Sequence, residues 1–95
     1  MEKWLIDLSE EDRTFIKRFV LASGSLKELA KQYNVSYPTL RIRLDRLIQK
    51  IKILDDSKTQ NPLRTKLQVL AAEGRISTGV AKEILKEYER IKKEE

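Results

Sequence analysis

Apolar residues recur at helical spacing along almost the whole chain, and each of the five stretches that carry them begins with a helix-capping residue. A side-chain oxygen at such a position accepts hydrogen bonds from the free N–H groups of the first helical turn. The chain has only three Gly and two Pro among its 95 residues, too few for the tight turns of a many-stranded sheet. The spacing therefore predicts an all-α protein of five helices, with caps at Ser9, Ser25, Ser36, Asn61 and Ser77.

The first three helices are predicted to form one domain over residues 1–54. Its first helix ends at Gly24, because glycine adopts the left-handed conformation of a helix C-terminus without penalty. We expect the apolar residues near the N-terminus to pack on this domain and each helix to bury one stripe. The predicted buried residues are Trp4, Leu5, Ile6, Leu8, Phe15, Ile16, Phe19, Val20, Leu26, Leu29, Ala30, Tyr33, Leu40, Leu44, Leu47, Ile48, Ile51 and Leu54.

Residues 62–95 are predicted to form a helical hairpin, joined to the first domain by a polar linker at 55–61. Gly74 ends the first hairpin helix, Ser77 caps the second, and the tail from Ile91 is expected to fray. The apolar stripes of the two helices are Leu63, Leu67, Leu70 and Ala71, and Val80, Ala81, Ile84, Leu85, Tyr88 and Ile91.

One segment has the residue types of a helix-turn-helix at the required spacing. The first helix needs a small residue where the second crosses it, and Ala30 meets this need. The turn needs a left-handed residue followed by an apolar plug, supplied by Asn34 and Val35. The second helix then needs a cap and an inward-facing apolar residue, supplied by Ser36 and Leu40. We therefore interpret this segment as a helix-turn-helix.

The net charge of +5 is concentrated on the second helix of this motif. Residues 1–35 balance at zero, whereas residues 36–54 carry five bases against Asp45 alone, a net charge of +4. A basic helix between neutral flanks is typical of a nucleic-acid contact. The alternative interpretation is a solvated helix face that happens to be rich in Arg.

The string around the turn reads Asn34-Val35-Ser36-Tyr37-Pro38-Thr39-Leu40-Arg41, followed by Arg43-Leu44-Asp45. It resembles a bacterial family of unknown function whose members carry a zinc ribbon and then a helix-turn-helix of the kind seen in sigma factor region 4. The hairpin is similar to the one at the end of such proteins, at Leu70, Glu73, Gly74, Ile76, Ser77, Ala81 and Leu85. The resemblance implies a helix-turn-helix over residues 9–54 and a hairpin that mediates self-association. A zinc ribbon requires cysteines and this sequence has none, so we expect no zinc module.

In a helix-turn-helix the second helix lies in the major groove, with the residues near its N-terminus against the base edges. In this chain those residues are Ser36, Tyr37, Thr39, Arg41 and Ile42. Arg41 has the geometry to bridge guanine O6 and N7, whereas the hydroxyls of Ser36 and Thr39 can also bind phosphate. The charge of the DNA backbone is expected to be met by Arg43, Arg46 and Lys50, and by Lys27 and Lys31 on the preceding helix.

Three side chains in this region have a second interpretation. Tyr37 can pack on its own helix, and Arg41 can form a surface salt bridge that contributes little. Asp45 lies near the same face, where it repels phosphate unless it pairs with a neighbouring Arg or accepts a hydrogen bond from a cytosine amine.

The sequence contains no Cys and no His. Disulfides, thiol nucleophiles, Cys/His zinc sites and imidazole catalysis are therefore excluded. The adjacent acids Asp55 and Asp56 lie in a polar segment with no base or nucleophile beside them in the sequence, so we expect no enzyme activity, no metal and no cofactor. We also expect a cytoplasmic protein, because no apolar run is long enough for a membrane span and the first residues lack the features of a signal peptide.

The leading hypothesis is a DNA-binding transcriptional regulator that reads the major groove of double-stranded DNA with the helix starting at Ser36. The alternative is a protein-interaction module that uses the same fold to bind another protein or a polymerase subunit; an enzyme fragment is a distant third. A lone helix-turn-helix contacts few base pairs, so we also expect a homodimer, built mainly by the C-terminal half. Leu44, Leu47, Ile51 and Leu54 have the spacing of a coiled-coil seam that could contribute to it.

Overall fold

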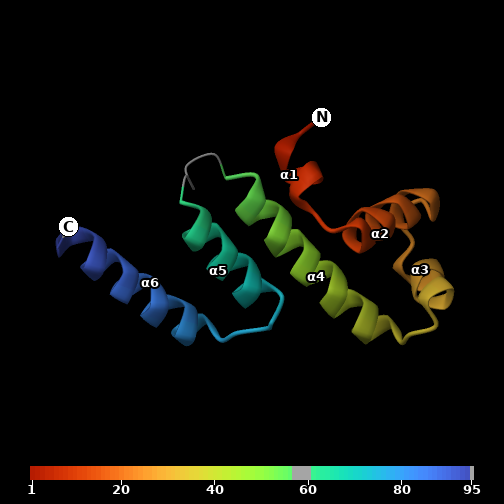
Figure 1. Cartoon of the computed structure of the whole chain (residues 1–95). Coiled ribbons are helices and arrows are strands. Elements are labelled where there is room, and N and C mark those ends of the chain that lie inside the picture. Colours follow the sequence, from red (N-terminus) through yellow and green to blue (C-terminus); the bar gives the residue numbers. More distant parts are fainter. Residues whose placement is uncertain (57–60, 95) are drawn as a thin grey trace.

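The computed structural model describes residues 1–56 and 61–94 (Figure 1). These residues form six α-helices and no strand, which confirms the predicted all-α class. The helices are α1 (Lys3–Asp7), α2 (Glu10–Leu21), α3 (Leu26–Tyr33), α4 (Tyr37–Leu54), α5 (Pro62–Ala72) and α6 (Thr78–Glu94).

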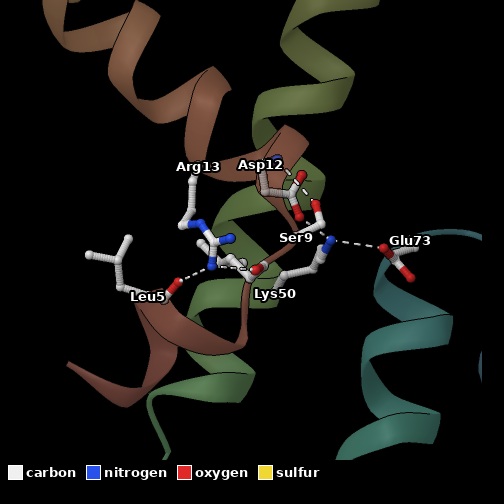
Figure 2. Close-up of polar contacts among 7 residues, drawn as sticks. Leu5, Ser9, Asp12, Arg13, Lys50 and Glu73 are labelled. Carbon is white, nitrogen blue, oxygen red and sulfur yellow. Dashed lines mark hydrogen bonds and ion pairs between the residues drawn. The ribbon is translucent and has the colours of Figure 1, made fainter. Parts of the chain in front are cut away.

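The sequence predicted five helices, and α1 is the additional one. It is only five residues long and has no side-chain cap, but its C-terminal end is held by Arg13 of α2. Nη1 of Arg13 donates to the carbonyl oxygens of Leu5, Ile6 and Leu8, at 3.4, 3.1 and 3.0 Å. Figure 2 shows the bond to Leu5. The last carbonyls of a helix have no partner within it, so a cation there is favourable. A helix this short depends on such tertiary contacts, which sequence spacing does not report.

All five predicted caps are formed. The hydroxyl oxygens of Ser9, Ser25, Ser36 and Ser77 each accept a hydrogen bond from the backbone N–H three residues later, at 3.0 to 3.3 Å. The side-chain oxygen of Asn61 accepts from two N–H groups of the first turn of α5, at 2.9 and 3.3 Å. These bonds satisfy donors that have no partner within the helix, which is why the helix starts were predictable.

The core of the helix-turn-helix unit lies where α2, α3 and α4 meet, with Phe15, Leu29 and Leu40 almost fully buried at its centre. The complete buried cluster is Leu8, Phe15, Leu29, Ala30, Leu40 and Leu47. Partly buried side chains pack around it, namely Trp4, Leu5, Ile16, Phe19, Leu26, Tyr33, Leu44, Ile51 and Leu54. The predicted core residues thus meet in one cluster, apart from three.

Val20, Ile6 and Ile48 were predicted to be buried and are exposed instead. Val20 is 66% exposed, because about 100° of rotation per residue places it about 140° around α2 from the buried Phe15. Ile6 and Ile48 stay exposed because α1 and α4 each bury only part of their circumference.

The hairpin packs on the first domain through α5. This helix runs antiparallel along α4, and α6 packs on α5 on the side away from α4 (Figure 1). The predicted coiled-coil seam of α4 is used within the monomer, since Leu47 is buried and Leu44, Ile51 and Leu54 pack against the core cluster. That part of the dimer prediction is therefore wrong.

Only part of the predicted apolar stripe of α6 is buried. Ala81 is buried and Leu85 and Tyr88 are half-buried, whereas three others are exposed: Val80, Ile84 and Ile91. The helix continues to Glu94 and so includes most of the tail from Ile91. The fraying of this tail stays a prediction, and Glu95 lies outside the described residues.

The protein is elongated, with extents of 53 × 29 × 17 Å along its principal axes. The turn between α3 and α4 lies toward one end of the long direction and α6 toward the other (Figure 1). The predicted division into two domains stays a prediction, and residues 57–60 of the predicted linker lie outside the described residues.

Candidate nucleic-acid interface

The turn between α3 and α4 has the backbone conformation that a helix-turn-helix requires. Asn34 is left-handed, with φ 55° and ψ 46°, as its residue type predicted. The backbone N–H groups of Asn34 and Val35 donate to Lys31 and Ala30 carbonyls at 3.1 Å, which closes the end of α3. Val35 was predicted to plug the interface, but its side chain is exposed, whereas Ala30 and Leu40 are buried in the core cluster.

The start of α4 is held by two hydroxyl side chains. Ser36 Oγ accepts from the backbone N–H of Thr39 at 3.3 Å and lies 2.9 Å from Thr39 Oγ1, within hydrogen-bond distance. Both residues are exposed. A DNA contact by either hydroxyl would therefore add to this local bond or replace it.

Beyond the cap, the first turns of α4 present three exposed side chains that the sequence assigned to base edges. Tyr37 is 51% exposed and Ile42 is 53% exposed, and Arg41 lies between them in sequence. This exposure of Tyr37 is compatible with both of its interpretations, because a ring that packs one face on its own helix leaves the other face in solvent. These three side chains and the capping hydroxyls form what we call the α4 reading face: Ser36, Tyr37, Thr39, Arg41 and Ile42.

Arg41 pairs with Asp45 one turn further along α4. Arg41 Nε lies 3.4 Å from Asp45 Oδ1, and the side chains are 53% and 57% exposed. An exposed pair of this kind contributes little to stability. Because Asp45 faces the Nε side, the two Nη groups of Arg41 remain available to an incoming ligand. The sequence left two interpretations open for Asp45, a pair with a neighbouring Arg and a hydrogen bond from a cytosine amine. This arrangement matches the pair with a neighbouring Arg.

Lys27 and Lys31 lie one helical turn apart on α3, and both side chains are exposed. Residues four apart lie on the same face of a helix, so the two ammonium groups form a pair of like charges there. Their exposure is compatible with the predicted contact to phosphates.

Arg43 faces the interior side of α4. Its guanidinium carbon lies 4.8 Å from the ring centroid of Phe15 and 4.9 Å from that of Tyr33. Cations are attracted to the faces of aromatic rings at such distances. The structure therefore separates Arg43 from the α4 reading face, and its predicted role at the DNA backbone is not supported by this position.

Arg46 extends toward the hairpin. Its Nη2 lies 3.0 Å from the point that a Cβ on Gly74 would occupy, so the guanidinium rests against the turn between α5 and α6. Arg46 is still exposed. Its predicted contact with the DNA backbone would require it to leave this turn.

Lys50 is the clearest correction to the predicted site. The residue is only 9% exposed, and its Nζ binds carboxylate oxygens of Asp12 on α2 and Glu73 at the end of α5, the latter at 2.8 Å (Figure 2). Lys50 also lines a groove between α1, α4 and α5, but its ammonium group is held by two carboxylates. The structure therefore corrects the prediction that it meets the DNA backbone. The sequence had no signal for this pairing, because the partners lie 38 and 23 residues away.

The titration of Lys50 reflects the same environment. Burial lowers the pKa of its ammonium group, but hydrogen bonds and charge from Asp12 and Glu73 outweigh burial, so the pKa lies above the ordinary value of 10.5. Lys50 is therefore a charged structural residue at neutral pH.

The basic excess of α4 is thus divided among several environments and does not form one continuous stripe. Arg41 is paired and exposed, Arg43 lies on aromatic rings, Arg46 rests on the hairpin turn and Lys50 is buried; the fifth base, Lys52, is exposed. Among the predicted DNA contacts, the basic groups open to a partner at this end of the molecule are consequently Lys27, Lys31 and Arg41.

A groove of about 630 Å³ runs between α1, the C-terminal half of α4, and α5. Its lining carries both signs of charge: the bases are Lys3, Lys50, Lys66 and Arg75, and the acids are Asp7 and Glu73. Within residues 1–56 and 61–94, no cluster of three or more acidic, His or Cys side chains is arranged to hold a metal ion. A search of the same part of the chain finds no helix with the length and apolar character needed to cross a membrane.

Comparison with known proteins bears on the first part of the chain. Residues 8–54 match the model of a family described as "Domain of unknown function (DUF2089)-HTH", where HTH denotes helix-turn-helix. The match begins at the buried Leu8 and ends with α4, so it covers the helix-turn-helix unit and excludes α5 and α6. Neither a curated protein nor a solved structure matches the chain. This segment is therefore similar to a helix-turn-helix family of unknown function.

Proposed function

We propose that the protein is a DNA-binding helix-turn-helix regulator of transcription that places the first turns of α4 in the major groove of double-stranded DNA. The observation that carries the proposal is the left-handed turn at Asn34, after which α4 begins with Tyr37, Arg41 and Ile42 exposed. The similarity of residues 8–54 to a helix-turn-helix family supports it. The resemblance to sigma factor region 4 and a cytoplasmic location belong to the same proposal. The protein acts by binding, without catalysis.

The roles of the side chains follow from their positions. Arg41 binds a guanine through its two Nη groups, and Ser36 and Thr39 bind a phosphate or a base edge. Lys27 and Lys31 on α3 meet phosphates beside the groove. This set has fewer cations than the sequence predicted, because Lys50 is bound by Asp12 and Glu73.

A titration of random-sequence duplex DNA at several salt concentrations tests the proposal. About two to three basic side chains per protomer approach phosphates, so the plot of log affinity against log salt should have a slope of about −2 to −3 per protomer, doubled for a dimer. Arg41→Ala should weaken binding to a preferred sequence by about 1–3 kcal/mol. Arg64→Ala is the matched control, since Arg64 is 51% exposed and pairs with Glu89 at 3.6 Å, but lies on α5.

The alternative is a protein-interaction module, and one observation favours it. Val35, Tyr37 and Ile42 are exposed apolar side chains near the start of α4, and exposed apolar groups mark surfaces that bind proteins when they are contiguous. If no duplex binds, or if binding does not depend on salt, DNA recognition is wrong and this alternative replaces it.

We further propose that the protein forms a homodimer through α6. Val80, Ile84 and Ile91 are exposed on this helix, at spacings that place them on one side of it. Ile84→Glu should shift the protein toward monomer in sedimentation experiments, whereas Lys82→Glu on the same helix should not. A wild-type protein that remains monomeric at high micromolar concentration would contradict this proposal.

A further inference from the structure

Ile42 is the most exposed large apolar side chain of α4, at 53%. Leu40 and Leu44 define the core side of this helix. They lie two residues before and two residues after Ile42. At about 100° per residue, Ile42 lies about 160° around the helix from each of them. It is therefore directed almost straight away from the core of the protein.

The helix neighbours of Ile42 include polar side chains: Thr39 lies about one turn before it, and Asp45 and Arg46 lie about one turn after it, all exposed. Arg41 precedes it and is engaged with Asp45, the pair being 53% and 57% exposed. An aliphatic side chain among charged groups leaves its apolar surface in water in the free protein. The apolar surface of Ile42 can therefore be buried only by a ligand, and a suitable ligand presents an apolar group between polar groups.

We propose that Ile42 is a specificity-determining residue that recognises thymine through its C5-methyl group. This inference rests on the proposed function, because it requires the first turns of α4 to enter the major groove. Thymine is the base that presents a methyl group there, next to a hydrogen-bond acceptor. An isoleucine offers no donor or acceptor, so it selects among bases only by burying such a methyl group.

The adjacent Arg41 predicts a second base in the recognised sequence. Its Nε faces Asp45 at 3.4 Å, so the carboxylate holds the guanidinium from one side while the two Nη groups stay open. Two parallel N–H donors match the O6 and N7 acceptors of guanine. Arg41 and Ile42 both belong to the α4 reading face, so the recognised sequence contains a guanine as well as a thymine.

The test replaces thymine by deoxyuridine, which has the same pairing edge but no methyl group. A preferred duplex is first selected from a random library with the wild-type protein, and each of its thymines is then replaced in turn. At one position the replacement should weaken wild-type binding about fourfold, which is the effect of one buried methyl group. In Ile42→Ala, the same replacement should change the affinity less than about 1.5-fold, because the partner of the methyl group is gone.

Ile48→Ala serves as the matched control, because Ile48 is also an exposed isoleucine of α4 but lies further from its N-terminus. This variant should keep the fourfold response. If a sequence is selected but no thymine responds, or if Ile42→Ala keeps the response, the inference is wrong while DNA recognition stands. If the library yields no preferred sequence although DNA is bound, the inference is also wrong. If the wild-type protein binds no duplex, the proposed function itself fails.

Discussion

Nζ of Lys50, in the middle of the chain, lies 2.8 Å from Oε2 of Glu73 at the C-terminal cap of α5. The same ammonium group binds Asp12 in the first turn of α2 (Figure 2). One buried cation therefore connects the helix-turn-helix unit to the hairpin. Ion pairs of this kind cost desolvation, and removing one member leaves the others uncompensated.

Replacing Lys50 by Met should lower the free energy of unfolding by about 1–3 kcal/mol. The value is below the roughly 3–5 kcal/mol expected for a fully buried pair, because the Asp12 and Glu73 side chains are 16% and 28% exposed and water can partly solvate them. Urea denaturation followed by circular dichroism measures the change. Lys52→Met, at an exposed position of the same helix, should stay within about 0.5 kcal/mol of wild type. Equal losses in both variants would show that the two carboxylates do not stabilise the fold through Lys50.

The contribution of Lys50 to stability should disappear at alkaline pH. Its pKa in the folded protein is raised above 10.5, so its contribution is fully present below that value and is lost as the pH rises through the folded pKa. The difference in unfolding free energy between wild type and Lys50→Met should therefore be constant from neutral pH to about pH 10 and shrink above it. Urea titrations of both proteins across this range measure it. A difference that shrinks between pH 7 and 9 would contradict the assignment.

Gly74→Ala should destabilise the protein by about 1–2 kcal/mol. Gly74 has φ 75°, which a residue with a Cβ adopts at a cost, and the new Cβ would lie 3.0 Å from Nη2 of Arg46. Gly79→Ala is the matched control, because Gly79 lies within α6 and the nearest atom to a new Cβ is 3.9 Å away. This control should stabilise the protein by about 0.5–1 kcal/mol through its higher helix propensity. Thermal denaturation of the two variants should thus shift in opposite directions.

The double variant Lys27→Ala/Lys31→Ala should weaken binding to all duplexes alike and reduce the magnitude of the salt slope by about 2. The reason is that both ammonium groups are exposed on α3, beside the α4 reading face. Lys50→Met should leave the slope unchanged, although Lys50 lies on α4 itself, because its charge is already neutralised by Asp12 and Glu73. Fluorescence anisotropy at several salt concentrations measures both slopes. A reduced slope in Lys50→Met alone would show that Lys50 leaves its ion pairs to meet DNA.

Local chemistry was sufficient to predict most of the helices and the turn between α3 and α4. A capping serine binds an N–H only three residues away, and the left-handed conformation of Asn34 depends on its own side chain and backbone. The spacing of Phe15, Leu29 and Leu40 likewise reports which side of each helix is buried, because the helical period is constant. These features involve neighbours in sequence, so the sequence alone contained them.

The partners of the charged side chains depended on tertiary structure. Five bases on one segment predicted a basic surface, yet packing placed Lys50 between Asp12 and Glu73 and Arg43 against the rings of Phe15 and Tyr33. The helix α1 is a second example, since Arg13 of the next helix holds its C-terminal end. A charge count along the sequence records how many cations a helix carries. Whether each cation faces solvent, a ring or a carboxylate is decided by which helices pack against it, and that depends on contacts between residues far apart in the chain.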